Sequence, residues 1–187
     1  MVQGSGPGEM TDDWRCLELA RAGDEVAWRV LFHRYYPSLV RMASCMTGSV
    51  DAAHDLAQES FVRLLHVEFR HRTGSFKSYL GTIAYRLALK ERKRSSSKYD
   101  LDAVPLVDDS PSPLELAIQN ETDGIIMRVI QSISIEQREI LALRYFGGHS
   151  YEEIAEITMI PIGTVKSRIF YGIKTCHEKL REQGVFK

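Results

Sequence analysis

Residues 150–181 constrain the fold more than any other stretch, because they predict two short helices joined by a tight turn. Ser150 can cap the first helix, and Glu153 lies where a capping box places its acidic partner. Apolar residues at 154, 155 and 157 give this helix one buried side. Pro161 suits the start of the second helix, since its fixed φ and missing N–H cost little there. The stretch therefore predicts a helix-turn-helix unit.

The second predicted helix has two unlike faces. One side carries small or apolar residues: Val165, Ile169, Gly172, Ile173 and Cys176. The other side mixes positive charge, hydroxyl and aromatic groups: Lys166, Ser167, Phe170, Tyr171 and Lys174. Such a row suits contacts with base edges in the major groove of DNA. We expect the first four of these to contact bases, and Lys174 and Arg168 to contact phosphates.

The charges of the chain are strongly segregated, although its net charge is only −1. Residues 61–98 hold ten Lys and Arg against two Asp and Glu, a net charge of +8. Residues 99–124 hold seven acidic residues without a Lys or Arg, and residues 161–187 have a net charge of +4. Two basic blocks separated by an acidic one indicate two contacts with nucleic acid. Solvated helix faces are the alternative for the first block.

Apolar spacing predicts helices along most of the chain. These helices are expected to end near Arg21, Met46, Val67, Arg94, Ile133 and Phe146. We expect Thr11 and Ser134 to be N-caps, and Pro37 to bend the second helix. Residues 96–113 are rich in Ser, Pro and Asp and lack a helical period, so they predict a flexible acidic linker. We therefore predict an all-α protein with domains at residues 11–95 and 114–187, preceded by a disordered extension at residues 1–10.

Several functional classes are disfavoured. We find no nucleophile–base pair or phosphate-cradling glycine loop, so we expect neither an enzyme nor a cofactor. Cys16, Cys45 and Cys176 are odd in number and widely separated, which favours reduced thiols. Histidines near Cys45 match no usual ligand spacing, so we expect no metal. No apolar run approaches the roughly 20 residues of a membrane helix and no export signal is recognisable, so we expect a cytoplasmic protein.

The first basic block interleaves cations with aromatic rings. The residues that we expect to bind nucleic acid are Phe69, Arg72, Phe76, Lys77, Tyr79, Tyr85, Arg86, Lys90, Arg92 and Lys93. Cations alone bind phosphate without sequence preference, whereas aromatic faces hold unstacked bases at about 1–3 kcal/mol each. The block could therefore hold a separated strand. The alternative is that Phe76 and Tyr79 are core residues.

One helix edge is polar and acidic. Asp55, Gln58 and Glu59 lie opposite Ala57 and Phe61 on the predicted helix that ends near residue 67. Spacing alone favours a solvated face for this edge.

Three segments in register resemble one family: DLAQESFVRLL at 55–65, GSFKSYLGTIAYRLAL at 74–89 and LALRYFGGHSYEEIAEITMIPIGTVKSRI at 141–169. They are similar to bacterial sigma-70 factors of the small, two-domain extracytoplasmic-function group, and the likeness spans residues 11–180. The resemblance implies a promoter-specificity subunit of RNA polymerase. Its region 2-like domain would bind core polymerase and open the −10 element, and its region 4-like domain would read the −35 element.

The resemblance also assigns the sites. It implies that Asp55, Gln58 and Glu59 grip the clamp helices of the largest polymerase subunit. It implies that the first basic block captures the melted −10 strand, with a base pocket near residues 69–75, and that an anti-sigma factor, often membrane-anchored, binds the chain. Tyr79, Tyr85, Arg86 and Lys90 depart from the family's usual residues, which leaves the preferred upstream base open. Met159 stands where a glycine is common in the turn of the helix-turn-helix unit.

A stand-alone helix-turn-helix regulator is the alternative function. It explains residues 150–181 but gives no role to the acidic edge or to the first basic block. Such a regulator would bind duplex DNA tightly by itself, usually as a symmetric dimer. A metal-dependent helical enzyme would need clustered ligands, which the spacing does not offer.

Overall fold

The computed structural model of the chain describes residues 12–66, 75–99 and 121–184. All regular secondary structure within these ranges is helical, as the apolar spacing predicts. The expected extension at residues 1–10 lies outside the described residues, as do Phe69, Arg72 and residues 100–113 of the predicted linker. None of the described helices combines the length and apolarity needed to cross a membrane.

Four helices form the N-terminal bundle: α1 (Asp13–Arg21), α2 (Glu25–Thr47), α3 (Val50–His66) and α4 (Phe76–Tyr99). Asp12, rather than the predicted Thr11, caps α1, because its carboxylate accepts a hydrogen bond from the Trp14 N–H at 3.0 Å. Helix α2 continues through Pro37. Helix α4 extends beyond the predicted end at Arg94, so the first part of the expected linker is helical.

Aromatic rings fix α4 against the rest of this bundle. Phe76 is 3% exposed, and its ring centroid lies 5.3 Å from that of Trp14 and 5.2 Å from that of Tyr35. Deeper in the bundle, Phe61 meets Trp28 edge to face at 5.4 Å. Such pairs contribute about 0.5–1.5 kcal/mol each beyond their burial. The orientation of α4 is therefore set by the core of its own bundle.

The C-terminal bundle consists of α6 (Glu121–Gln131), α7 (Ile135–Leu141), the π-helical η1 (Ala142–Phe146), α8 (Tyr151–Thr158) and α9 (Ile162–Glu182). Ser134 caps α7, and Ser150 with Glu153 forms the predicted capping box on α8. The helix predicted to end near Phe146 does so, but its last five residues are π-helical. The predicted two-helix unit is thus present as α8 and α9.

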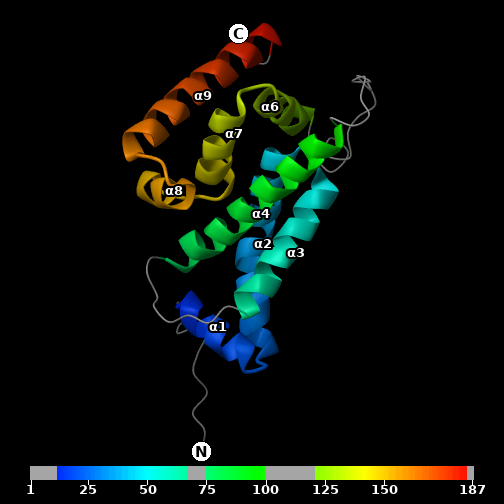
Figure 1. The fold of residues 1–187 in the computed structure, drawn as a ribbon, viewed down its shortest axis with the longest axis vertical. Helices are drawn as coiled ribbons and strands as arrows, with labels where there is room; N and C mark the ends of the chain where they lie inside the picture. Colours follow the sequence, from blue (N-terminus) through cyan, green and yellow to red (C-terminus); the bar gives the residue numbers. More distant parts are fainter. Residues whose placement is uncertain (1–11, 67–74, 100–120, 185–187) are drawn as a thin grey trace, which may run out of the picture.

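The two bundles pack against each other, and Figure 1 shows α4 lying beside α8. Their buried side chains form one continuous apolar cluster, which includes Leu31 of α2 and Leu143 of η1. Gln131 at the end of α6 donates a hydrogen bond to the Cys45 carbonyl near the end of α2 at 2.8 Å. Arg138 holds this amide by donating to its Oε1 at 2.6 Å. The sequence predicted a flexible linker between the domains, and it did not predict that the two bundles pack against each other.

Candidate nucleic-acid interface

The outer surface of α9 presents the predicted DNA-contacting residues to solvent. Phe170 and Tyr171 are 64% and 57% exposed, and their ring centroids lie 5.3 Å apart. Lys166, Ser167 and Lys174 are exposed on the same side of the helix. We call these five residues the α9 face. Exposed aromatic rings among cations are suited to a polyanion with flat apolar bases.

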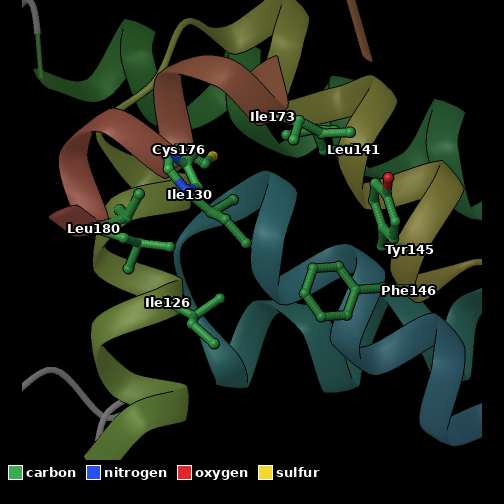
Figure 2. Close-up of a pocket in the computed structure, with 10 residues that line it drawn as sticks. Ile126, Ile130, Leu141, Tyr145, Phe146, Ile173, Cys176 and Leu180 are labelled. Atoms are coloured by element: carbon green, nitrogen blue, oxygen red, sulfur yellow. The ribbon is translucent and has the colours of Figure 1, made fainter. Parts of the chain in front are cut away.

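Packing on the opposite side of α9 holds this face outward. Val165 and Ile169 are buried, as predicted, and Arg168 is half-buried between the two sides. A Cβ at Gly172 would lie 3.1 Å from Leu141 Cδ1, so the glycine allows α7 to approach closely. Ile173, which the sequence places on the apolar side of this helix, is 42% exposed. It lies at the rim of an apolar groove beside Leu141 (Figure 2).

The turn before α9 contains a backbone conformation that is unusual for its residue type. Met159 has a left-handed conformation with φ 59° and ends α8. This conformation costs about 1–2 kcal/mol for a residue with a Cβ. The Met159 side chain is 82% exposed, so its burial offsets little of that cost. The sequence shows that a glycine is lacking in this turn, and the structure shows that Met159 takes the left-handed position itself.

The predicted polymerase-binding edge lies along α3. Asp55 and Gln58 are exposed and Glu59 is half-exposed, while the other side of the helix is buried. Glu59 accepts a hydrogen bond from Arg63 Nε at 2.7 Å. The edge borders a groove of about 510 Å³ between α3 and α4, and Val62 in this groove is 49% exposed. Val62 was not among the residues singled out from the sequence.

The α4 residues predicted to bind DNA fall into three classes of exposure. Arg86, Lys90 and Lys93 are exposed, and Lys77, Tyr79 and Arg92 are half-buried. Phe76 and Tyr85 are buried, at 3% and 7% exposure. For Phe76 the expectation of a base contact is corrected, because its ring belongs to the core of the N-terminal bundle. The remaining α4 residues lie along one helix, as the sequence predicts.

Tyr85 is buried by the C-terminal bundle. Its hydroxyl donates a hydrogen bond to Glu139 Oε2 at 3.0 Å, and the Arg92 guanidinium pairs with the other oxygen of the same carboxylate. Burial, followed by the charge of Glu139, raises the pKa of Tyr85 above its ordinary value. Glu139 is itself 8% exposed on α7. The sequence gave no signal for this contact, since the residues are far apart along the chain.

A second polar contact joins the start of α4 to the start of α8. Ser75 Oγ donates to Glu153 Oε1 at 2.6 Å, and Lys77 Nζ lies 3.6 Å from Glu153 Oε2. Lys77 also donates to the Gly148 carbonyl. Burial tends to raise the pKa of Glu153, but the Ser75 hydroxyl, the Ser150 N–H and the Lys77 charge together hold it below its ordinary value. The carboxylate is therefore ionised at neutral pH.

The C-terminal bundle also contains an apolar groove of about 320 Å³ (Figure 2). Its lining comes from α6, α7, η1 and α9: Ile126, Val129, Ile130, Leu141, Tyr145, Phe146, Ile173, Cys176, His177 and Leu180. The groove lies on a different side of α9 from the α9 face. Among the described residues, no three His, Cys, Asp or Glu side chains form a group suited to a metal ion.

Comparisons with known proteins match one family model to each of the two bundles. The family model for Sigma-70 region 2 matches residues 31–98, and the model for Sigma-70 region 4 matches residues 123–176. The chain is 30% identical over 185 residues to the ECF RNA polymerase sigma-E factor of Escherichia coli K12, covering 92% of this chain and 96% of that protein. It is 27% identical over 178 residues to the ECF sigma factor SigW of Bacillus subtilis, covering 89% and 95%.

A solved structure is also similar. The sigma factor RpoE of Bartonella quintana, determined in complex with the anti-sigma factor NepR, superposes with a TM-score of 0.61 at 23% identity. The match covers 82% of this chain and 96% of that one. At this identity the likeness supports the fold.

Proposed function

Because this chain belongs to the extracytoplasmic-function group of sigma-70 factors, we propose that it directs RNA polymerase to promoters through two separate DNA-binding surfaces. The observation that carries this proposal is the α9 face. It exposes Phe170 and Tyr171 between cations, on a helix whose other side is held in the core. It also lies within the region 4 match. This surface would read the −35 element in the major groove.

The N-terminal bundle would supply polymerase binding and strand capture. Asp55, Gln58 and Glu59 would contact the clamp helices of the largest polymerase subunit. The exposed α4 cations Arg86 and Lys90 would contact the melted −10 strand. Two cationic surfaces on separate bundles match two separate promoter elements.

The proposed division of labour leaves RNA synthesis to the polymerase. Sigma factors are transcription-initiation factors, and this chain would contribute positioning and strand capture without catalysis of its own. We expect the chain to act in the cytoplasm, bound to RNA polymerase. A stand-alone regulator would leave the region 2 match, from residue 31 to residue 98, without a role. We also propose an anti-sigma partner, since a structurally similar sigma factor was solved with one.

A charge-reversal variant tests the polymerase-binding role. Asp55→Lys with Glu59→Lys should lower affinity for core polymerase about a hundredfold, as expected when paired charges at the centre of an interface are lost. Retention on immobilised core enzyme and transcription from a promoter library measure the effect, and circular dichroism checks the fold. Glu25→Lys, which reverses an exposed charge on α2, is the control. Unchanged retention of the folded double variant would contradict the assignment.

A further inference from the structure

The turn before α9 and the outer side of that helix expose several apolar side chains. Among the described residues, nine large apolar or aromatic side chains are exposed, and four of them lie here: Met159, Ile162, Phe170 and Tyr171. Exposed apolar residues that are scattered singly need no explanation, but a group of them marks a binding surface. Ile162, at 38% exposure, has no part in the DNA contacts described so far.

Ile162 extends the α9 face by one turn towards the start of the helix. It precedes Lys166 by four residues and Phe170 by eight, so the three side chains form one row along α9. Ile162 is also the first residue of α9. In a helix-turn-helix unit, the N-terminal residues of the second helix contact base edges in the major groove. A side chain without hydrogen-bonding groups therefore lies where sequence is read.

The start of α9 is suited to a close approach of the DNA backbone. Pro161 precedes the helix and provides no side-chain hydrogen bond to its first turn. A phosphate oxygen can accept from the backbone N–H groups of such a turn. A Cβ at Gly163 would meet no atom of the described residues within 4 Å, so this position leaves room for the DNA. Such an approach would bring Ile162 to the major groove beside it.

The polar groups of this helix offer few of the hydrogen bonds that distinguish bases. Residues 162–174 contain no Asn or Gln, the side chains that pair with adenine, and their one arginine, Arg168, is half-buried. The Ser167 hydroxyl donates to the Thr164 carbonyl at 3.0 Å, so its proton is held within the helix. Lys166 can contact guanine. Apolar contact with the C5-methyl group of thymine is the readout that suits the remaining side chains.

We propose that Ile162 and Phe170 read thymine methyl groups, so that the −35 element of this sigma factor carries thymine opposite each of them. The inference rests on the proposed function, since it takes the α9 face as the reader of the −35 element. The two side chains are separated by eight residues, or about 12 Å along the helix axis, so each contacts its own base pair. Ile162 is then a residue that determines promoter specificity.

Removal of single methyl groups from the DNA tests this proposal. A −35 element is first selected from a random library by the full chain bound to core polymerase, and each of its thymines is then replaced in turn by deoxyuridine. This change deletes the methyl group and keeps the base pair. Loss of one buried methyl group should weaken holoenzyme binding about fourfold at the position that faces Ile162. Fluorescence anisotropy with labelled promoter DNA measures the effect.

The Ile162→Ala variant completes a double-mutant cycle with this DNA change. It should bind the thymine promoter more weakly than the wild type, and it should no longer distinguish thymine from deoxyuridine at that position. Ile162→Val keeps a branched apolar side chain and should retain about twofold discrimination. Circular dichroism checks that each variant folds, and Ile162→Val carries the test if Ile162→Ala does not fold.

Two further variants show whether the effect belongs to the methyl contact. Ile135→Ala removes an isoleucine of similar exposure, 44%, that lies on α7 outside the α9 face. It should bind as the wild type does and keep the fourfold discrimination expected for one methyl group. Lys166→Ala should weaken binding to the thymine and deoxyuridine promoters by the same factor, because its contact does not involve the methyl group.

The outcomes separate this proposal from the proposed function. A selected −35 element without thymine in either strand would overturn the thymine assignment. Equal binding of the thymine and deoxyuridine promoters by the wild type, or equal discrimination by the wild type and Ile162→Ala, would overturn it as well. Each of these results leaves the sigma role intact, because the holoenzyme has selected a promoter. Failure of the chain to direct core polymerase to any promoter in the library would refute the proposed function, and this inference with it.

Discussion

The α9 face and the α4 residues predicted to bind DNA have similar compositions, but their aromatic rings differ in exposure. Both combine Lys or Arg with aromatic residues, and both were predicted to bind DNA. On α9, Phe170 and Tyr171 are exposed, whereas on α4, Phe76 and Tyr85 are buried. The burial has two causes, since Phe76 lies in the core of its own bundle and Tyr85 lies under Glu139 of the other. Composition thus predicts a polyanion-binding segment, but it does not show which side chains of that segment are exposed.

Disabling the α9 face should give the largest effect of these tests. Lys166→Ala with Phe170→Ala should reduce transcription from promoters that depend on the −35 element by about 10- to 100-fold, because each base contact is worth about 1–3 kcal/mol. The preferred −35 sequence should also shift, which a promoter library can measure. Arg181→Ala, an exposed cation further along the same helix, is the control. Equal loss for both variants would indicate a general charge effect instead.

Acidification should weaken the contact between the two bundles, whose packed arrangement we call the closed form. Burial lowers the pKa of His149 from 6.5 to about 4, while Glu153 and Lys77 face the ring with opposing effects. The closed form disfavours the protonated imidazole, so the stability that neutral His149 gives it is complete above pH 6.5 and falls between 6.5 and about 4. The pKa of Glu153 is lowered too, and its protonation in acid would weaken the closed form in the same direction.

At about pH 5.5, the equilibrium should therefore shift towards separated bundles by about tenfold relative to neutral pH. Small-angle scattering across this range measures the shift. His149→Gln, which cannot titrate, should flatten the response above pH 5. A wild-type radius that stays constant from pH 7.5 to 5 would show that His149 does not control closure.

The smallest effect concerns the turn that orients the α9 face. Met159→Gly should relieve the left-handed strain of about 1–2 kcal/mol, but glycine gives back roughly 0.5–1 kcal/mol through chain entropy. The free energy of unfolding should rise by about 0.5–1 kcal/mol, measured by urea denaturation. Gly163→Ala, at the start of α9 where a Cβ would meet no described atom within 4 Å, is a contrasting substitution. A less stable Met159→Gly variant would show that the Met159 side chain contributes to the turn.

The local features of this fold could be predicted from the sequence. Helix caps such as Ser150, and the buried row of Val165 and Ile169, depend on residues within a few positions of one another. The exposed α9 face followed from the same periodicity. By contrast, the end of α4 was placed too early, because polar residues after Arg94 carry no apolar period even though they are helical.

The contact between the bundles could not be predicted in this way. The Glu139 pairing with Arg92 joins residues 47 positions apart, and the fit of His149 against Gly81 depends on where a glycine lies in space. The side-chain spacing gives no indication of either. The same limit explains why the competing interpretations of Phe76 could be separated only by its contacts with Trp14 and Tyr35.

The amide of Gln131 has a consequence for α2. This helix has no basic residue in its last turn, and two of its final carbonyls, those of Ser44 and Cys45, accept hydrogen bonds from Gln131 of the other bundle. When the bundles part, the Cys45 carbonyl must turn to water, whereas the Ser44 carbonyl keeps its hydrogen bond from the Gly48 N–H. The end of α2 is then a natural reporter of separation of the two bundles, readable by amide hydrogen exchange.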